Sequence, residues 1–145
     1  MSLREMFLVI PPIFVLLGLL DVWISRERLM RYLGPGAGAR GTITAFVMGS
    51  AAAGPLYAAF PIAAVLMRKG SSFFNVMVFI GAWSTTKLPM FLFEYSALGA
   101  GFALVRLAAN VPAILLMSLI LSRVVPPGHY AELAARALDD ARKSS

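Results

Sequence analysis

Four polar residues interrupt a long apolar stretch near the middle of the chain and carry its best candidate chemistry. The interruption and its flanks read Trp83, Ser84, Thr85, Thr86, Lys87, Leu88 and Pro89. An ionisable side chain inside a membrane-length stretch is costly to bury, so it faces a cavity or a charged partner. Lys87 is therefore half of an internal ion pair, a contact for a substrate anion, a carrier of a coupling proton, or a side chain that reaches the interface. The three hydroxyls coordinate a ligand or pair the backbone groups that the interruption frees, and Trp83 packs, stacks or gates.

A second apolar stretch, residues 41–67, is interrupted by small residues and prolines. Its candidate site residues are Gly49, Ser50, Gly54 and Pro55, and Pro61 follows as a structural break, as Pro89 does in the other stretch. Small residues let membrane helices pack closely, whereas a broken helix exposes N–H groups that can bind a ligand. Gly54-Pro55 favours the break, because proline lacks an N–H and clashes with the preceding turn. Discontinuous helices line binding sites in transporters, so both interruptions are candidate substrate sites.

Three other charged residues in or beside the apolar stretches are candidates for ion pairs: Asp21, Glu94 and Arg106. Either acidic residue could pair with Lys87, and Arg106 could extend to the interface. Met48, Met77 and Met90 lie near the interruptions, and soft metals accept thioether ligands. Methionine in an apolar helix is usually filler, so we predict no metal site and no cofactor.

The composition indicates an integral membrane protein. Of the 145 residues, 59% are hydrophobic and 14% are charged, and the apolar residues come in long runs. The net charge of +6 comes mainly from residues between those runs, so we interpret it as topology signals and lipid-headgroup contacts rather than nucleic-acid binding. Cysteine is absent and histidine occurs once, which excludes disulfides, thiolate chemistry and a histidine-based metal cluster within one chain. No nucleophile–histidine pair, carboxylate pair or phosphate loop suggests an enzyme.

The sequence predicts an all-α membrane domain over residues 1–125 and a short cytoplasmic tail helix within 126–145. We expect three or four transmembrane helices, one or two of them broken or re-entrant. The expected segments are a retained first span at 6–24, a basic connection with a short interfacial helix at 25–40, and the interrupted stretch at 41–67. An interrupted span at 73–93 ending at Glu94, a turn at 95–101 and a last span at 102–121 follow.

Charge asymmetry bears on the topology. The 25–40 connection and the Arg68-Lys69 turn are basic, whereas the turn after Glu94 holds no Lys or Arg. If basic loops face the cytoplasm, residues 41–67 enter and leave on the same side as a re-entrant hairpin, which gives three crossings. The alternative is four crossings with the basic 25–40 loop outside. Three or four crossings rarely enclose a pathway alone, so we expect a homodimer, either parallel or antiparallel.

Three segments carry a resemblance to a known family. They are LLGLLDVW at 16–23, GSAAAGPLYAAFPIAAVLMRKG at 49–70 and FNVMVFIGAWSTTKLPMFLFE at 74–94. They resemble the UPF0718, or YraQ/ArsP-like, group of predicted bacterial permeases, of which the chain looks like a half-length member. The resemblance implies a multi-pass permease of the bacterial inner membrane. Some relatives export trivalent organoarsenicals, but this chain lacks the cysteine that trivalent arsenic prefers, so we do not predict that substrate.

The residues and the resemblance together predict a membrane permease subunit. We expect a secondary transporter that moves a small, potentially anionic solute through a site built from the interruptions at 49–55 and 81–89 of a homo-oligomer. The alternatives are a membrane scaffold subunit of a larger complex and a channel. The expected partners are the lipid bilayer, a second copy and an unidentified small solute.

Overall fold

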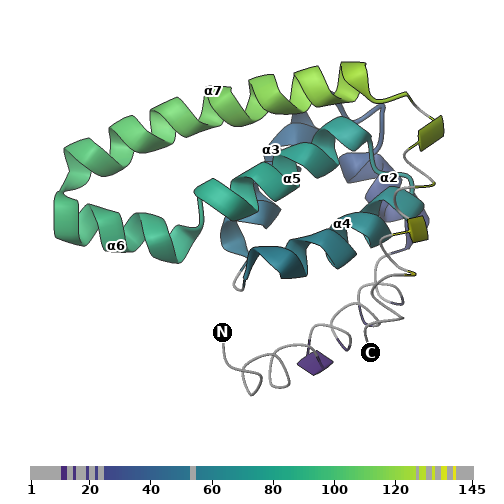
Figure 1. Cartoon of the computed structure of the whole chain (residues 1–145), viewed down its shortest axis with the longest axis horizontal. Coiled ribbons are helices and arrows are strands. Elements are labelled where there is room, and N and C mark those ends of the chain that lie inside the picture. Colours follow the sequence, from purple (N-terminus) through teal and green to yellow (C-terminus); the bar gives the residue numbers. More distant parts are fainter. Residues whose placement is uncertain are drawn as a thin grey trace.

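The computed structural model describes residues 25–52 and 55–126, together with scattered positions on either side, and every regular element that it describes is a helix (Figure 1). The first predicted span, Asp21, Gly54 and most of the predicted tail helix lie outside the described residues. The prediction of an all-α chain is confirmed for the part that the structure describes.

The basic connection contains the short helix α2, Arg26–Leu33, that the sequence predicts. Ser25 caps its start, because the side-chain hydroxyl accepts a hydrogen bond from the backbone N–H of Arg28 at 3.4 Å. Gly34 ends it, and its N–H donates to the carbonyl of Met30 at 3.0 Å. α2 packs on the helix that follows it.

The interrupted stretch at 41–67 forms two short helices with a 3-10 turn between them, and part of the connection lies outside the described residues. α3 spans Gly38–Ala51, the 3-10 turn η1 spans Leu56–Ala58, and α4 spans Ala59–Arg68. At about 1.5 Å per residue, α3 and α4 are about 21 Å and 15 Å long, which is shorter than a hydrocarbon core of about 30 Å. Pro61 is the third residue of α4, in the first turn, where a missing N–H leaves no helical hydrogen bond unmade.

Both ends of this hairpin lie at the same end of the molecule. The Ser72 N–H, one residue before α5, donates to the Leu33 carbonyl at the end of α2, at 2.9 Å. Asn75, in the first turn of α5, donates through Nδ2 to the same carbonyl at 3.0 Å and accepts from the Thr42 hydroxyl of α3 at 3.4 Å. α4 ends only a few residues before α5 begins. The buried amide of Asn75 therefore ties the start of α3 to the start of α5.

The second interruption separates α5, Phe73–Thr85, from α6, Leu88–Leu98. Pro89 is the second residue of α6, so it starts a new helix rather than bending an old one. The helical stretch Phe73–Leu98 and α7, Ala100–Val124, are the two described segments that are long and apolar enough to cross a membrane.

The boundaries near Glu94 differ from the prediction. α6 continues four residues beyond Glu94, and Gly99 alone separates it from α7. Gly99 has φ +90°, a left-handed conformation that only glycine adopts readily, so one residue reverses the chain where a turn over 95–101 was predicted. α7 is also longer than the predicted 102–121 and continues through Pro112.

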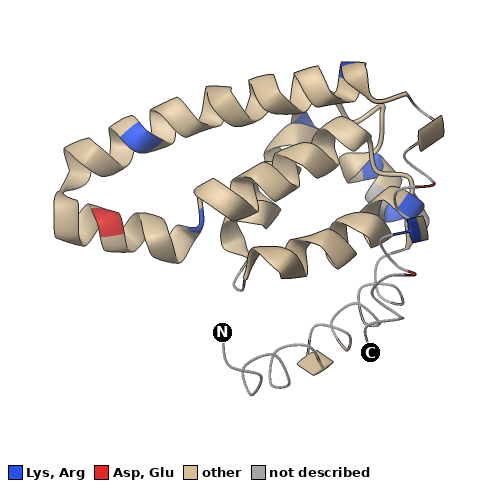
Figure 2. Ribbon diagram, in the orientation of Figure 1, with Lys and Arg blue, Asp and Glu red and all other residues tan. Residues whose placement is uncertain are grey.

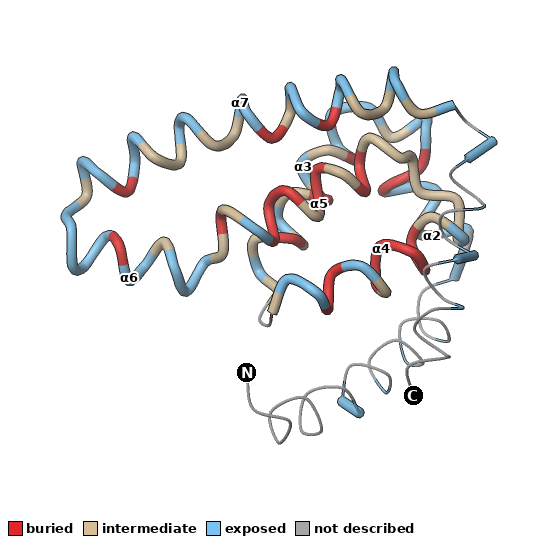
Figure 3. Tube along the Cα trace, viewed as in Figure 1, coloured by how far each residue is buried: buried red, intermediate tan, exposed pale blue. Residues whose placement is uncertain are grey.

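α5 is the central helix, and α3, α4 and α7 pack around it, as the buried positions in Figure 3 show. Gly41, Ala45 and Gly49 form the buried face of α3, a small-residue stripe that lets two helix backbones approach. By contrast, most residues of α6 and α7 are exposed apolar side chains. These outer faces are available to lipid or to another membrane helix.

Basic residues gather at one end of the molecule, whereas Lys87, before α6, and Arg106, on α7, lie away from that end (Figure 2). The end formed by α2, the last turn of α4 and the last turn of α7 is basic, with Arg31, Arg68, Lys69 and Arg123. Glu94 lies near the opposite end, on α6.

Candidate functional site

The two interruptions meet in the fold. Ser50, in the last turn of α3, lies with its Oγ 3.0 Å from Oγ1 of Thr86, the residue that ends α5. Thr86 is buried and also donates its hydroxyl hydrogen to the Ala82 carbonyl at 3.0 Å. Because a hydroxyl has one hydrogen, Ser50 is then the donor to Thr86. A hydrogen bond between the two hydroxyls therefore joins the end of α3, at the hairpin tip, to the end of α5.

Gly49 makes this approach possible. A Cβ at Gly49 would lie 2.4 Å from the carbonyl oxygen of Phe79 and 3.1 Å from the backbone nitrogen of Trp83. α3 therefore rests directly on the backbone of α5. Trp83 is 4% exposed and packs edge-on against Phe79 with ring centroids 5.4 Å apart, which assigns it a packing contact in the core.

The hydroxyls of the second interruption donate hydrogen bonds to backbone carbonyls of α5. Ser84 and Thr85 donate to the Gly81 carbonyl at 2.9 Å and 2.8 Å, and Thr86 donates to that of Ala82. These contacts pair carbonyl groups at the end of α5, which is one of the two roles that the sequence allowed. Their oxygen lone pairs remain able to accept further hydrogen bonds.

Two other predicted site residues lie at helix starts. Lys87 immediately precedes α6, is half-buried, and its carbonyl accepts from the Phe91 N–H at 2.9 Å. Pro55 precedes η1 at the hairpin tip. Both residues shape the interruptions through their backbones, whatever role the Lys87 ammonium has.

Glu94 forms its ion pair with Arg106 of α7, through Oε1 and Nη1. The second guanidinium nitrogen, Nη2, donates to the Thr85 carbonyl at the end of α5, at 3.4 Å. Arg106 thus connects three segments, α5, α6 and α7. The sequence named Glu94 and Asp21 as possible partners of Lys87 and included Arg106 among the ion-pair candidates. The reversal at Gly99 brings Arg106 across from Glu94.

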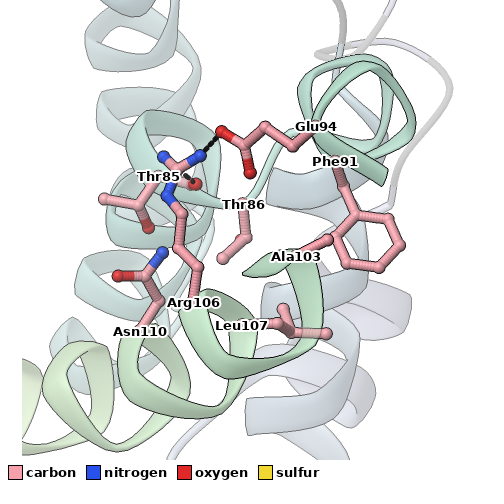
Figure 4. Close-up of a pocket in the computed structure, with 8 residues that line it drawn as sticks. All are labelled: Thr85, Thr86, Phe91, Glu94, Ala103, Arg106, Leu107 and Asn110. Carbon is pink, nitrogen blue, oxygen red and sulfur yellow. Dashed lines mark hydrogen bonds and ion pairs between the residues drawn. The ribbon is translucent and has the colours of Figure 1, made fainter. Parts of the chain in front are cut away.

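These contacts surround a small cavity of about 10 Å³, roughly the space of one water molecule. Its wall comes from the end of α5, from α6 and from α7 (Figure 4). The lining residues are Thr85, Thr86, Phe91, Glu94, Ala103, Arg106, Leu107 and Asn110. Thr85 and Thr86 are the predicted substrate-site residues in this wall, with Glu94 and Arg106 from the predicted ion-pair set.

Asn110 is a wall residue that the sequence predictions did not include among the site residues. It lies one turn beyond Arg106 on the same face of α7, and Figure 4 shows its amide beside the Arg106 side chain. Among the described residues no hydrogen bond to this amide is found. The i, i+4 spacing of Arg106 and Asn110 was the available signal.

A family described as a predicted permease, ArsP_1, matches residues 2–144. The chain belongs to the ArsP_1 family. No curated protein and no solved structure matches it. Membership confirms the resemblance on which the sequence interpretation relied.

ArsP_1 membership and the two membrane-length apolar segments make this chain a membrane permease. A permease family also implies a transporter rather than an enzyme. The sequence-predicted interruptions at 49–55 and 81–89 thus lie in a permease and meet at Ser50 and Thr86.

Proposed function

We propose that this chain is a subunit of a secondary transporter of the bacterial inner membrane that moves a small solute through the junction of α3, α5, α6 and α7. The observation that carries the location is the contact between Ser50 and Thr86, which brings two broken helices together. In transporters such breaks lie at the substrate site, because open backbone is tolerated in a membrane only beside a cavity.

In this proposal the α3–α4 hairpin is re-entrant. Its two helices are too short to cross, and the hydrogen bonds of Asn75 hold the start of α3 at the end of the molecule where α4 also finishes. That end carries the basic residues of α2, α4 and α7, so the positive-inside rule puts it in the cytoplasm. The hairpin tip, with Ser50, then lies within the bilayer.

The working unit is a homodimer. One protomer leaves α6 and the outer face of α7 with many exposed apolar side chains, which lipid can cover but which cannot enclose a polar pathway. A second copy, parallel or antiparallel, would complete the enclosure around the junction.

The solute is small and polar or anionic. Arg106 and Asn110 supply N–H donors to the wall of the cavity, beside the Thr85 and Thr86 hydroxyl oxygens and the Glu94 carboxylate. Lys87 adds a cation at the start of α6. Hydrogen-bond donors and cations select for acceptor-rich solutes. Lys87 is also a candidate for carrying a coupling proton.

Flux through reconstituted vesicles tests this function. The purified chain is inserted in liposomes and the entry of sodium acetate, sodium nitrate and acetamide is followed by light scattering. Entry of an anion that saturates with concentration supports a carrier, and entry that stays linear supports a channel. Absence of flux, with recovery of the chain only as part of a complex with another protein, supports the alternative of a scaffold subunit.

A further inference from the structure

α6 has an unusual pattern of burial. Its apolar residues are exposed or half-buried, and its single buried residue among Leu88–Leu98 is the charged Glu94. α6 packs mainly on α7, and the pair between Glu94 and Arg106 is the polar contact between these two helices. An acidic side chain, rather than an apolar one, therefore anchors this helix.

The Glu94 carboxylate lies in a site that favours anions. A guanidinium has five N–H donors, and the contacts with Glu94 and the Thr85 carbonyl do not use them all. The Asn110 amide brings two further donors one turn along α7, without a hydrogen bond among the described residues. Donors in excess around a cation match an oxyanion, which accepts hydrogen bonds and donates none.

The cavity itself is too small for a solute. Its volume of about 10 Å³ accommodates about one water molecule. Displacement of the Glu94 carboxylate from the guanidinium would make room there for the carboxylate of an organic solute. Two non-helical residues, Thr86 and Lys87, separate α5 from α6, and Gly99 alone separates α6 from α7.

We propose that Arg106 is the substrate-binding residue for a small carboxylate, and that the Glu94 carboxylate occupies the substrate's position in the empty protein. The solute carboxylate exchanges with Glu94, and Asn110 donates to the incoming oxygen atoms. This inference rests on the proposed transport function and names its substrate class. The exchange also differs from a purely structural role of the Glu94–Arg106 pair in holding α6 to α7. In the exchange, removal of the Glu94 carboxylate must strengthen the binding of the solute carboxylate to Arg106.

Acetate binding to the purified full-length chain tests the exchange, with acetamide as the uncharged probe of the same size. The apparent Kd comes from the rise in melting temperature with ligand concentration. We expect Glu94→Gln to bind acetate at least about tenfold more tightly than wild type, a difference of about 1.4 kcal/mol. Arg106→Gln should lose the rise in melting temperature with acetate. Acetamide should not raise the melting temperature of either variant.

Two matched variants control for the loss of a charge. Glu27→Gln removes an exposed carboxylate on α2, and Arg123→Gln removes an exposed guanidinium near the end of α7. Both should bind acetate as wild type does. If Glu94→Gln does not fold, Glu94→Asp keeps the charge but shortens the reach, and it should tighten acetate binding by a smaller factor.

Unchanged or weaker acetate binding in Glu94→Gln, or an acetate response that survives in Arg106→Gln, overturns the exchange. If wild type moves solutes while Glu94→Gln shows no tightening, the transport proposal stands and this inference fails. If Glu94→Gln tightens but wild type moves no solute, the site binds anions and the transport proposal fails.

Discussion

The hydroxyl oxygens of Ser50 and Thr86 lie 3.0 Å apart and join the tip of the α3–α4 hairpin to the end of α5. The two residues are 36 positions apart in the chain, and each belongs to a different interruption. This contact converts two separate breaks into one junction.

The Ser50–Thr86 contact should be energetically coupled. Ser50→Ala and Thr86→Val each remove one partner, and each should lower the free energy of unfolding by about 1 kcal/mol. The double variant should lose less than the sum, because the second change removes a contact already broken. Denaturant titration of the protein in detergent measures all three.

Ser84→Ala is the matched control, since the exposed Ser84 hydroxyl donates to the Gly81 carbonyl of its own helix and makes no other hydrogen bond to a described residue. Combined with Ser50→Ala it should give additive losses. Additive losses for Ser50→Ala with Thr86→Val would mean that the junction is not held by this hydrogen bond.

Gly49→Ala should weaken the packing of α3 on α5. The added methyl group would lie 2.4 Å from the Phe79 carbonyl oxygen, so the helices must separate, at about 1–3 kcal/mol. Gly101→Ala is the same change in α7, where nothing lies within 4 Å of the new Cβ, and it should be neutral or stabilising by about 0.5–1 kcal/mol. Thermal unfolding compares them, and equal effects would contradict the close approach of α3 and α5.

Much of this fold could be predicted because each break has a local signal. Ser25 and Ser72 cap α2 and α5, Pro89 starts α6, and the small residues around Gly49 indicate close helix packing. Gly99 was less informative, since one glycine in a run of small residues does not reveal that the chain reverses at that residue alone.

The site was predicted less completely than the fold. Its polar wall includes an ion pair across the reversal at Gly99, which joins Glu94 to Arg106. The spacing of residues in the sequence indicates which side chains can meet on one helix, whereas Arg106, the partner of Glu94, lies on the next helix. The sequence singled out the hydroxyls, and Thr85 and Thr86 lie in the cavity wall, but whether they serve the backbone or a ligand depends on positions that spacing does not give.

Cysteine labelling should establish the topology, because the chain has no native cysteine. We expect Gly36→Cys and Lys69→Cys to react with an impermeant thiol reagent from the cytoplasmic side, and Ala97→Cys from the opposite side. The reason is that both ends of the hairpin lie at the basic end of the molecule, while Ala97 is in the last turn of α6, which finishes at the opposite end (Figure 1). Labelling of positions 36 and 69 from opposite sides would eliminate the re-entrant hairpin.

Lys87→Met should lower the rate of anion flux by about tenfold, the loss expected when a charged contact of about 1.4 kcal/mol is removed. Lys69→Met removes the same charge from the basic end and should leave flux near the wild-type rate. Vesicle uptake at several pH values measures both. Wild-type flux and pH dependence in Lys87→Met would exclude this ammonium from binding and from proton coupling.

The most direct test of the central claim, that a solute pathway runs through this junction, is the reactivity of Asn110→Cys with a charged thiol reagent in intact vesicles. Asn110 lies near the middle of α7, in the wall of the cavity, whereas Leu116 of the same helix is 62% exposed on the apolar outer face. The account predicts that Asn110→Cys is labelled from water, that acetate slows the labelling, and that Leu116→Cys is not labelled. Asn110→Cys as unreactive as Leu116→Cys, with or without acetate, would contradict it.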